Sequence, residues 1–312
     1  MEHDILIEAR GLTRRYGPNV AVQGIDLTLR RGEILGLLGP NGAGKSTTMK
    51  MLTGNLAPSS GSVKINGIDI ALQPKQAKQS LGYLPELPPV HPEVTVDEYL
   101  DFAASLHGVP KATRKAAVAK AKQSCGLNEM SRRLIGNLSK GFQQRVGLAQ
   151  AIVHQPPVII LDEPTVGLDP IQIREIRSLI AALAQNHSVI LSSHILPEIQ
   201  AVCSRVMIVH RGRVVFQDSM AAVNAQNASR LAAIFRHAPK SFAVPGIAST
   251  QSLGEGRFVF TPEAGADPRE ALVAASVANG WGLLELKTEG RTLEEIFVSL
   301  TSSDTTELKE AA

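Results

Sequence analysis

The clearest chemistry in the sequence lies in nine consecutive residues that follow an apolar run: Gly39, Pro40, Asn41, Gly42, Ala43, Gly44, Lys45, Ser46 and Thr47. They fit the pattern G-x-x-x-x-G-K-[ST] of a phosphate-binding loop. The glycines let successive backbone N–H groups converge on one anion, Lys45 can reach the β- and γ-phosphates, and the Ser46 hydroxyl can bind Mg²⁺. A helix that begins here adds its positive N-terminal end. A simple glycine-rich turn with a surface lysine is disfavoured, because strand, loop and helix signals occur together.

Carboxylates occur where such a site needs them. Asp162 and Glu163 follow the continuous apolar run 158–161, which predicts a buried strand. An acid at the end of a buried strand, in a chain with a phosphate-binding loop, indicates the Walker B aspartate that holds Mg²⁺. Glu163 is then the candidate general base for a water that attacks the γ-phosphate. His194 follows another expected strand, 188–191, and is predicted to contact the γ-phosphate, with a structural histidine as the alternative.

Three further regions carry weaker signals. Tyr16 lies in an expected loop, 14–18, and could stack on adenine, although a surface or core-lid tyrosine fits about as well. Ser139 and Gly141 open an expected helix and offer a second anion contact, but an ordinary capped helix also explains them. Glu86 follows a predicted strand, at the kind of strand end where α/β proteins gather ligand contacts.

The elements that position these residues can be read from apolar periodicity and turn signals. The sequence predicts strands at 5–9, 25–29 and 81–84, a hairpin over 62–70, and helices over 45–53, 73–80, 140–153 and 171–186. Residues 85–155 are predicted to form a helical subdomain inserted into the sheet domain. Its first helix, 96–107, is expected to have Thr95 as its cap and one apolar face made of Tyr99, Phe102, Ala103 and Leu106.

The C-terminal part differs in character from the rest. The sheet domain, residues 1–218, is predicted to end with strands at 206–209 and 214–216, and residues 219–301 indicate a small α+β accessory domain. Its expected elements are helices at 218–227, 268–279 and Thr292 to Leu300, the last of them capped, and strands at 242–244, 257–260 and 282–287. Trp281 is predicted to lie in the core. The polar residues 302–312 predict a flexible tail.

Composition limits the class of protein. The chain has 312 residues, 44% of them hydrophobic, which suits one large domain and a smaller one. A net charge of +3 without a dense basic tract predicts no nucleic acid partner, and the lysine-rich helix 111–125 fits a solvated surface better than a binding patch. Cys125 and Cys203 match no metal-ligand spacing and fit a reduced cytosolic compartment. No run approaches the roughly 20 apolar residues that span a bilayer, so a membrane role would need another chain.

Taken together, the motifs resemble the nucleotide-binding subunit of an ABC transporter over roughly residues 5–218. In the order of that family they are the aromatic loop at Tyr16, Walker A at 39–47, the signature at 138–143, Walker B at 158–163, the D-loop around Asp169 and the switch histidine His194. The resemblance implies a P-loop NTPase fold of ABC type: an α/β protein with a mixed sheet core, an antiparallel β subdomain, the helical insertion and the accessory domain.

The resemblance also implies an activity and partners. Two copies of such a subunit close head to tail around two ATP molecules with Mg²⁺, and Ser139 and Gly141 of one copy act on the ATP held by the other. It further implies ATP hydrolysis that drives a separate transmembrane permease, which would dock on the helical insertion near 87–99, from a peripheral position on the cytoplasmic face of the inner membrane.

Two motifs depart from the family pattern. Glu86 stands where glutamine is usual and brings extra negative charge close to the γ-phosphate, although a carboxylate could still bind Mg²⁺. The signature has Lys140 and Phe142 where glycine and glutamine are common. These variants resemble the ATPases that serve exporter-type and gliding-motility-type permeases, which implies export.

Two other function classes remain open at this point. One is a soluble ABC-type ATPase that acts on ribosomes, DNA or iron–sulfur assembly, and the single cassette without a long coiled coil argues against it. The other is a nucleotide-binding regulator without turnover. The presence of Lys45, Asp162, Glu163 and His194 together argues against that class. The cargo of a transporter is not encoded in these motifs.

Overall fold

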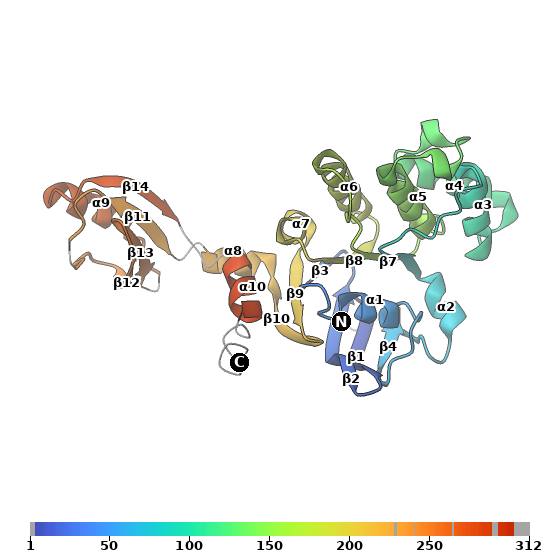
Figure 1. Ribbon diagram of the computed structural model, residues 1–312, viewed down its shortest axis with the longest axis horizontal. Coiled ribbons are helices and arrows are strands. Elements are labelled where there is room, and N and C mark those ends of the chain that lie inside the picture. Colours follow the sequence, from blue (N-terminus) through green and yellow to red (C-terminus); the bar gives the residue numbers. More distant parts are fainter. Residues whose placement is uncertain (1–3, 228–229, 240, 264, 289–292, 303–312) are drawn as a thin grey trace. The chain divides into compact units, whose positions relative to one another are not determined.

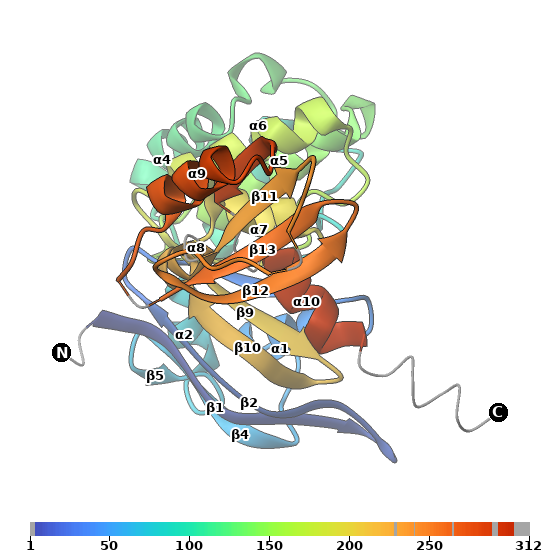
Figure 2. The same cartoon turned by 90° about the vertical axis from the view of Figure 1, so that its left-hand side faces the viewer.

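The structure is a computed structural model that describes residues 4–227, 230–239, 241–263, 265–288 and 293–302. The chain divides into two compact units, Met1–Asp218 and Ser219–Ala312, and each has its own hydrophobic core. Figures 1 and 2 show the elements of both units from two sides.

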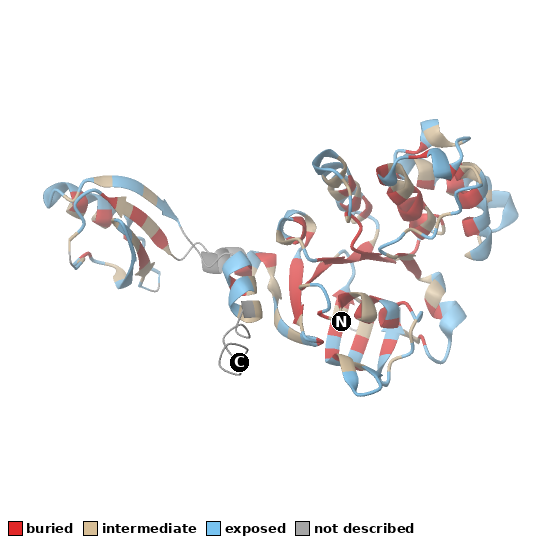
Figure 3. Ribbon diagram, viewed as in Figure 1, coloured by how far each residue is buried: buried red, intermediate tan, exposed pale blue. Residues whose placement is uncertain are grey.

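A six-stranded sheet forms the centre of the first unit, in the order β10-β9-β3-β8-β7-β6. Its strands are β3 (Ile34–Leu38), β6 (Leu81–Leu84), β7 (Val158–Asp162), β8 (Ser188–Ser193), β9 (Arg205–His210) and β10 (Arg213–Ser219). From β9 to β6 all neighbouring strands are parallel. β7 and β8 are buried along their whole length (Figure 3), as expected for strands covered on both faces. Parallel pairing brings the carboxyl ends of these strands to one edge of the sheet.

A smaller antiparallel sheet, in the order β2-β1-β4-β5, shares a core with the central sheet. Its strands are β1 (Ile5–Tyr16), β2 (Asn19–Arg30), β4 (Ser60–Ile65) and β5 (Ile68–Asp69), and the helix α1 (Lys45–Leu52) contacts both sheets. The shared core includes Leu27 of β2, Met49 of α1 and Ile160 of β7, all of which are buried. The helix that follows the phosphate loop is therefore held from both sides by apolar contacts.

The predicted first strands are correct in type but too short. β1 and β2 continue to Tyr16 and Asn19, which pair with each other, so Tyr16 ends a strand and does not lie in a loop. The apolar alternation that defines a strand in the sequence is interrupted near Gly11 and Gly24, which adopt φ values of 57° and 67°. The pairing register shifts near Gly11, and such shifts move side chains off the regular two-residue period.

Other predicted elements near the phosphate loop are confirmed. β4 and β5 form the expected hairpin, and its turn residues Asn66 and Gly67 have φ values of 50° and 79°, as a type I′ turn requires. Gly54 has φ 64° just after α1, as expected for a residue that ends a helix. α2 (Pro74–Gln79) and β6 lie where the sequence predicted them.

The helical region consists of α3 (Val96–Leu106), α4 (Lys111–Ser124) and α5 (Lys140–Ile152), with short 3-10 helices at Asn128–Met130 and Ile135–Asn137. Thr95 caps α3 in a full capping box: its hydroxyl accepts from the Glu98 N–H, and the Glu98 carboxylate accepts from the Thr95 N–H at 2.8 Å. α5 packs against β6, where a Cβ on Gly82 would overlap the Ala151 carbonyl oxygen. Only glycine permits this approach of helix to strand.

The predicted apolar face of α3 is partly wrong. Tyr99 and Ala103 are buried as expected, but Phe102 and Leu106 are 52% and 71% exposed. The buried face is made instead of Val96, Tyr99, Leu100, Ala103 and Ala104, because α3 meets α4 and α5 along that stripe. The i, i+4 spacing of Phe102 and Leu106 is shared by the true and the predicted faces, so periodicity alone could not separate them.

Two helices follow the strands that carry the acids and the histidine. α6 (Pro170–Leu183) follows β7, and α7 (Leu196–Val202) follows β8 and packs on β3, where a Cβ on Gly36 would come within 2.7 Å of Ile199. α6 ends three residues before the predicted end of that helix. Cys125 and Cys203 are buried free thiols, and burial raises the pKa of each to about 12. None of the helices in the described part of the chain is long and apolar enough to cross a membrane.

The second unit contains a four-stranded sheet in the order β12-β13-β11-β14. Its elements are α8 (Met220–Asn227), β11 (Leu231–Phe235), β12 (Ile247–Gly254), β13 (Arg257–Pro262), α9 (Arg269–Ala278), β14 (Leu283–Thr288) and α10 (Leu293–Ser302). All of the strand pairs are antiparallel, and α9 contributes the buried Leu272 to the core on one face of the sheet (Figure 2). Trp281 packs against this core, as predicted.

The sequence misjudged two parts of this unit. The predicted strand at 242–244 is a loop, and its Phe242 ring covers the sheet at 4.8 to 5.2 Å from the rings of Phe235, Phe258, Phe260 and Trp281. β11 and β12 were not predicted. β12 is almost entirely exposed and polar, so it lacks the apolar alternation that indicates a strand. Thr292 and the predicted tail beyond Ser302 lie outside the described residues.

A pair of stacked histidines joins the helical region to the central sheet. The rings of His107, at the end of α3, and His154, just after α5, lie 3.8 Å apart and nearly parallel. His154 Nε2 donates to the Leu81 carbonyl at 3.1 Å, which leaves Nδ1 as a buried lone pair without a partner in the described structure. Burial, with smaller contributions from His107 and His187, lowers the pKa of His154 to about 4.

This pKa predicts acid sensitivity. The unfolded chain binds a proton at His154 near pH 6.5 and the folded chain only near pH 4, so the free energy of unfolding should fall as pH falls through that window. The decrease should approach about 3 kcal/mol in full. Urea unfolding between pH 7 and 4 measures it. His154→Gln should show a shallower decrease, and equal slopes for the two proteins would contradict the assignment.

Candidate active site

The phosphate loop joins β3 to α1 and is closely packed by its neighbours. Lys45 is 5% exposed, and its Nζ donates to the carbonyl oxygens of Gly39 and Pro40 at 2.8 and 3.2 Å. A Cβ on Gly39 would overlap the Val209 carbonyl oxygen, and Gly44 has φ 102°. Both positions therefore require glycine, one for space and one for conformation. The loop conformation that the sequence predicted depends on these two residues.

Asp162 and Glu163 lie at the carboxyl end of β7, beside the end of β8. The buried Ser192 hydroxyl accepts from the Glu163 N–H at 2.9 Å and donates to Asp162 Oδ1 at 2.6 Å. Ser46 Oγ donates to the same Asp162 oxygen at 3.2 Å. Burial raises the pKa of Asp162, against the two hydroxyl hydrogen bonds, and the charges of Glu163 and Glu86 raise it further. Ser192 was not recognised from the sequence as part of the site.

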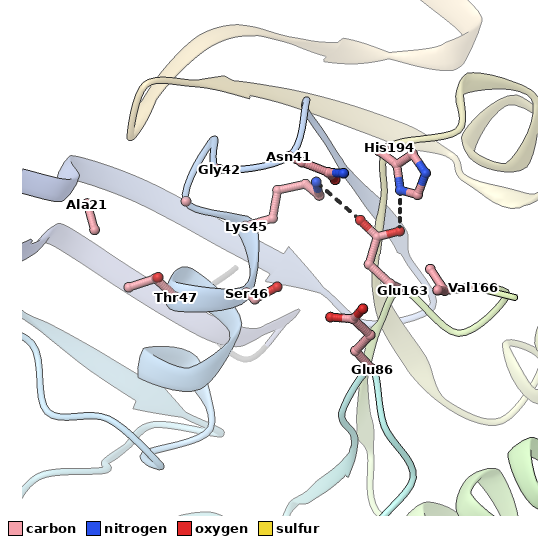
Figure 4. Close-up of a pocket in the computed structure, with 11 residues that line it drawn as sticks. Ala21, Asn41, Gly42, Lys45, Ser46, Thr47, Glu86, Glu163, Val166 and His194 are labelled. Atoms are coloured by element: carbon pink, nitrogen blue, oxygen red, sulfur yellow. Dashed lines mark hydrogen bonds and ion pairs between the residues drawn. The ribbon is translucent and has the colours of Figure 1, made fainter.

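Glu163 connects the loop to the histidine. Its carboxylate lies 3.1 Å from Lys45 Nζ and 2.8 Å from His194 Nδ1, as the two dashed lines in Figure 4 show. Glu163 and Lys45 are both buried, whereas the His194 side chain is 39% exposed. Glu163 also has φ 49°, a backbone conformation that is uncommon for residues other than glycine and that often marks functional sites.

These groups surround a cavity of about 380 Å³ (Figure 4). It is lined by Ala21, Asn41, Gly42, Gly44, Lys45, Ser46, Thr47, Glu86, Glu163, Val166 and His194. The structure thus brings together most of the residues predicted from the loop, the strand ends and Glu86. Ala21 and Val166 are additions that no sequence signal indicated, because they contribute only small apolar surfaces.

The signature and D-loop residues line a different cavity. Ser139, Gly141 and Asp169 line a second cavity, of about 290 Å³, between α5 and α6. Ser139 caps α5, and Asp169 caps α6 by accepting from the N–H groups of Ile171 and Gln172 at 2.9 Å. A Cβ on Gly141 would come within 2.7 Å of Gln172, so glycine is needed for the two helices to approach. Within one copy, these residues are not part of the Lys45 cavity.

Tyr16 is also separate from this cavity. Its side chain is 48% exposed at the end of β1, and the Arg14 guanidinium lies 4.7 Å from the ring centroid. Tyr16 is not among the residues that line the Lys45 cavity. This partial exposure leaves open both of the interpretations that the sequence allowed.

A divalent cation fits the oxygen atoms of the site. Ser46 Oγ and Asp162 Oδ1 are 3.2 Å apart, and the Glu86 carboxylate lines the same cavity. Hydroxyl and carboxylate oxygens are the ligands that Mg²⁺ prefers, and Mg²⁺ usually takes its remaining ligands from phosphates and water. In the described residues no cluster of three or more His, Cys, Asp or Glu side chains could hold a metal ion alone.

A glycine cradle with a buried lysine, together with two consecutive carboxylates at the carboxyl end of β7, defines a P-loop nucleoside triphosphatase. Comparison with known proteins gives the family. Residues 22–166 match the family model described as "ABC transporter". A bacitracin transport ATP-binding protein of Bacillus licheniformis is 38% identical over 67% of this chain and 68% of its own length. The chain therefore belongs to the ATP-binding proteins of ABC transporters.

Other relatives agree with this assignment. The linearmycin resistance ATP-binding protein LnrL of Bacillus subtilis is 29% identical over 95% of this chain and 98% of its own length. A solved structure described as an ATP-binding subunit of an ABC transporter has 31% identity and a TM-score of 0.64, and the match covers 71% of this chain and 92% of that one. The predicted family, fold class and ATPase activity are confirmed, and the transporter class is favoured over a soluble ABC-type ATPase.

The position of Ser192 generates a prediction. Ser192→Ala removes the hydroxyl that supports both Asp162 and the Glu163 backbone, and should lower the free energy of unfolding by about 1–3 kcal/mol. It should also slow ATP hydrolysis by about tenfold or more, because both carboxylates lose their position. Chemical denaturation and phosphate release measure the two effects.

Ser188→Ala is the matched control. Ser188 is buried at the other end of β8, and its hydroxyl accepts from the Gly32 N–H at 2.8 Å. This variant should lose comparable stability but keep its rate of hydrolysis. Equal rates in the two variants would show that Ser192 has no special connection to the site.

Proposed function

We propose that the Lys45 cavity binds MgATP and that Glu163 activates the water that hydrolyses it. One observation carries the proposal: the Glu163 carboxylate is held between Lys45 and His194, at 3.1 and 2.8 Å, beside the glycine cradle (Figure 4). A general base has to be buried, oriented and within reach of the γ-phosphate. Glu163 meets the first two requirements through contacts within this chain, and Lys45 places it near the expected phosphate position.

The proposed roles follow from charge. The backbone N–H groups of residues 41–44 and the Lys45 ammonium bind the β- and γ-phosphates and neutralise charge as the γ-phosphoryl group leaves. Glu163 accepts a proton from the attacking water. His194 orients Glu163 through the hydrogen bond to Nδ1 and contacts the γ-phosphate.

The proposed metal ligands are Ser46 and Asp162. Mg²⁺ bound there would neutralise charge on the β- and γ-phosphates. Glu86 is proposed as a further, weaker contributor, since it lines the cavity and its charge acts on Asp162. Tyr16 is proposed to stack on adenine, a role that its exposed ring supports.

The second cavity supports action between two copies. Ser139, Gly141 and Asp169 line a surface separate from Lys45, and the N-terminus of α5 can contact an anion there. We assign these residues to the ATP held by a second copy, in a dimer around two ATP molecules. Structures of cassettes from this fold are described as dimeric, one of them with ADP and Pi bound.

The proposed physiological role is export at the cytoplasmic face of the inner membrane. The named relatives include bacitracin transport, linearmycin resistance and multidrug transporter ATP-binding proteins. The multidrug relative is 34% identical, and this chain covers 39% of its length. A separate permease is proposed to dock on the helical insertion, about 85–155, where Leu87 is 78% exposed. Residues 1–218 then form the ATPase domain and 219–301 an accessory domain, with a tail from 302.

The assignment of Glu163 predicts a specific defect. Glu163→Gln should still bind ATP but hydrolyse it about 10²–10⁴-fold more slowly, because a carboxamide cannot accept the proton. Phosphate release and equilibrium binding of ATP to the purified chain measure both. Lys45→Ala should lose binding itself. Glu129→Gln, at an exposed position in the helical region, is the control and should behave as wild type. Normal turnover in Glu163→Gln would remove Glu163 from this role.

The transporter role predicts a membrane partner. Affinity purification of Glu163→Gln from gently solubilised membranes with ATP and Mg²⁺ should recover a polytopic membrane protein in near-equal amount, because slow hydrolysis prolongs the closed complex. The co-purifying chains would be identified by mass spectrometry. Recovery of ribosomes, nucleic acid or only soluble chains would contradict the role.

A further inference from the structure

A buried carboxylate outside the nucleotide cavity connects the two elements that carry Glu163 and His194. Glu198, in the first turn of α7, is 1% exposed. Its Oε1 accepts from the Thr165 hydroxyl at 2.6 Å, and its Oε2 accepts from the Ser193 hydroxyl at 2.7 Å. Each carboxylate oxygen therefore receives one short hydrogen bond from a different segment.

The two hydroxyls lie next to the residues of the site. Thr165 is two residues after Glu163, in the loop that leaves β7, and Ser193 directly precedes His194. The Ser193 oxygen also accepts from the Ile195 N–H at 2.9 Å, so the backbone is fixed on both sides of the histidine. Glu198 thus hydrogen-bonds both to the loop that follows Glu163 and to the residue that precedes His194.

The backbone around Glu163 requires such support. Glu163 has φ 49°, which side chains rarely adopt unless the surrounding contacts enforce it. Ser192 holds the residue from one side through the Glu163 N–H, and Thr165 anchors the following loop to α7 from the other. Ser192 and Ser193 are consecutive in β8, so their side chains point to opposite faces of the sheet. Ser192 hydrogen-bonds to the Glu163 backbone, and Ser193 hydrogen-bonds to Glu198.

Glu198 places a carboxyl group at a position where an apolar side chain would pack more simply. Arg177 of α6 forms a long ion pair with Glu198: its Nη2 lies 4.0 Å from Glu198 Oε1, and its side chain is 28% exposed. A buried carboxylate needs hydrogen bonds as well as a counter-ion, and the two hydroxyls supply them. Arg177 lies on α6, the helix that Asp169 caps.

We infer that Glu198 is a positioning residue for ATP hydrolysis, which sets the geometry of Glu163 against His194 without touching the nucleotide. The inference rests on the proposed function, because it presumes that Glu163 and His194 act on the γ-phosphate. A structural role for Glu198 in folding alone is the competing explanation. The two differ in where the defect of a variant should appear.

The test compares Glu198→Gln with wild type in the purified full chain, by steady-state ATP hydrolysis. A misplacement of a catalytic group by about 1 Å can lower the reaction rate about 100-fold. We therefore expect kcat to fall about 10- to 100-fold, while KM for ATP changes less than about threefold. Thr165→Val should reproduce the loss, and Thr165→Ser, which keeps the hydroxyl, should restore most of the rate.

A double-mutant cycle separates positioning from folding. In single-turnover assays with radiolabelled ATP, Glu198→Gln should cause no further loss of rate in a Glu163→Gln background, because its effect acts through Glu163. A purely structural defect would lower the rate in both backgrounds by the same factor, and that result would overturn the inference.

Glu33→Gln is the matched control. Glu33 is a largely buried carboxylate that pairs with Arg205 at 2.5 and 3.1 Å and directly precedes β3, at the end opposite the phosphate loop. It should lower stability without lowering kcat. Normal turnover in Glu198→Gln together with a strong defect in Glu163→Gln would overturn only the inference about Glu198 and would leave the proposed function in place. Normal turnover in Glu163→Gln would instead overturn the proposed function.

Discussion

The parallel register of the central sheet is the constraint on which the site depends. Leu38 of β3 lies opposite Ser193 of β8, and Asp162 of β7 lies opposite Ser192. The phosphate loop, the acids and the histidine each follow one of these strand ends, so three segments far apart in the chain meet at one edge. A slip of one residue would turn Asp162 to the other face of the sheet. Apolar burial along β7 and β8 specifies the register, and the chemistry follows from it.

The sequence was most informative where function and structure are local. The phosphate loop could be predicted because its glycines, Lys45 and Ser46 are adjacent, and β7 because four buried aliphatic residues precede Asp162. It was least informative where the apolar pattern is weak and contacts with distant residues determine the structure. β12 is polar and exposed and forms by pairing with β13, and Phe102 obeys the same helical spacing as the buried face of α3.

Within the site, the sequence identified the groups but not their connections. Ser46 and Asp162 are 116 residues apart, and nothing in the chain between them indicates that a serine of β8 supports the same carboxylate. The signature and D-loop residues are a different case. Ser139 and Asp169 both cap helices, a local role within one copy. Any additional role depends on a second molecule, which no pattern within one chain can reveal.

On the proposed roles, the contact between Lys45 and Glu163 sets the order in which the two residues act. The two buried side chains neutralise each other, and a buried charge is costly without such a counter-ion. A triphosphate carries more negative charge than one carboxylate and would draw the lysine toward itself. On the proposed roles, the glutamate is then released to a water only after the substrate has engaged the lysine. On those proposed roles, Glu163 stays paired with Lys45 until ATP binds, so activation of the water follows binding of the substrate.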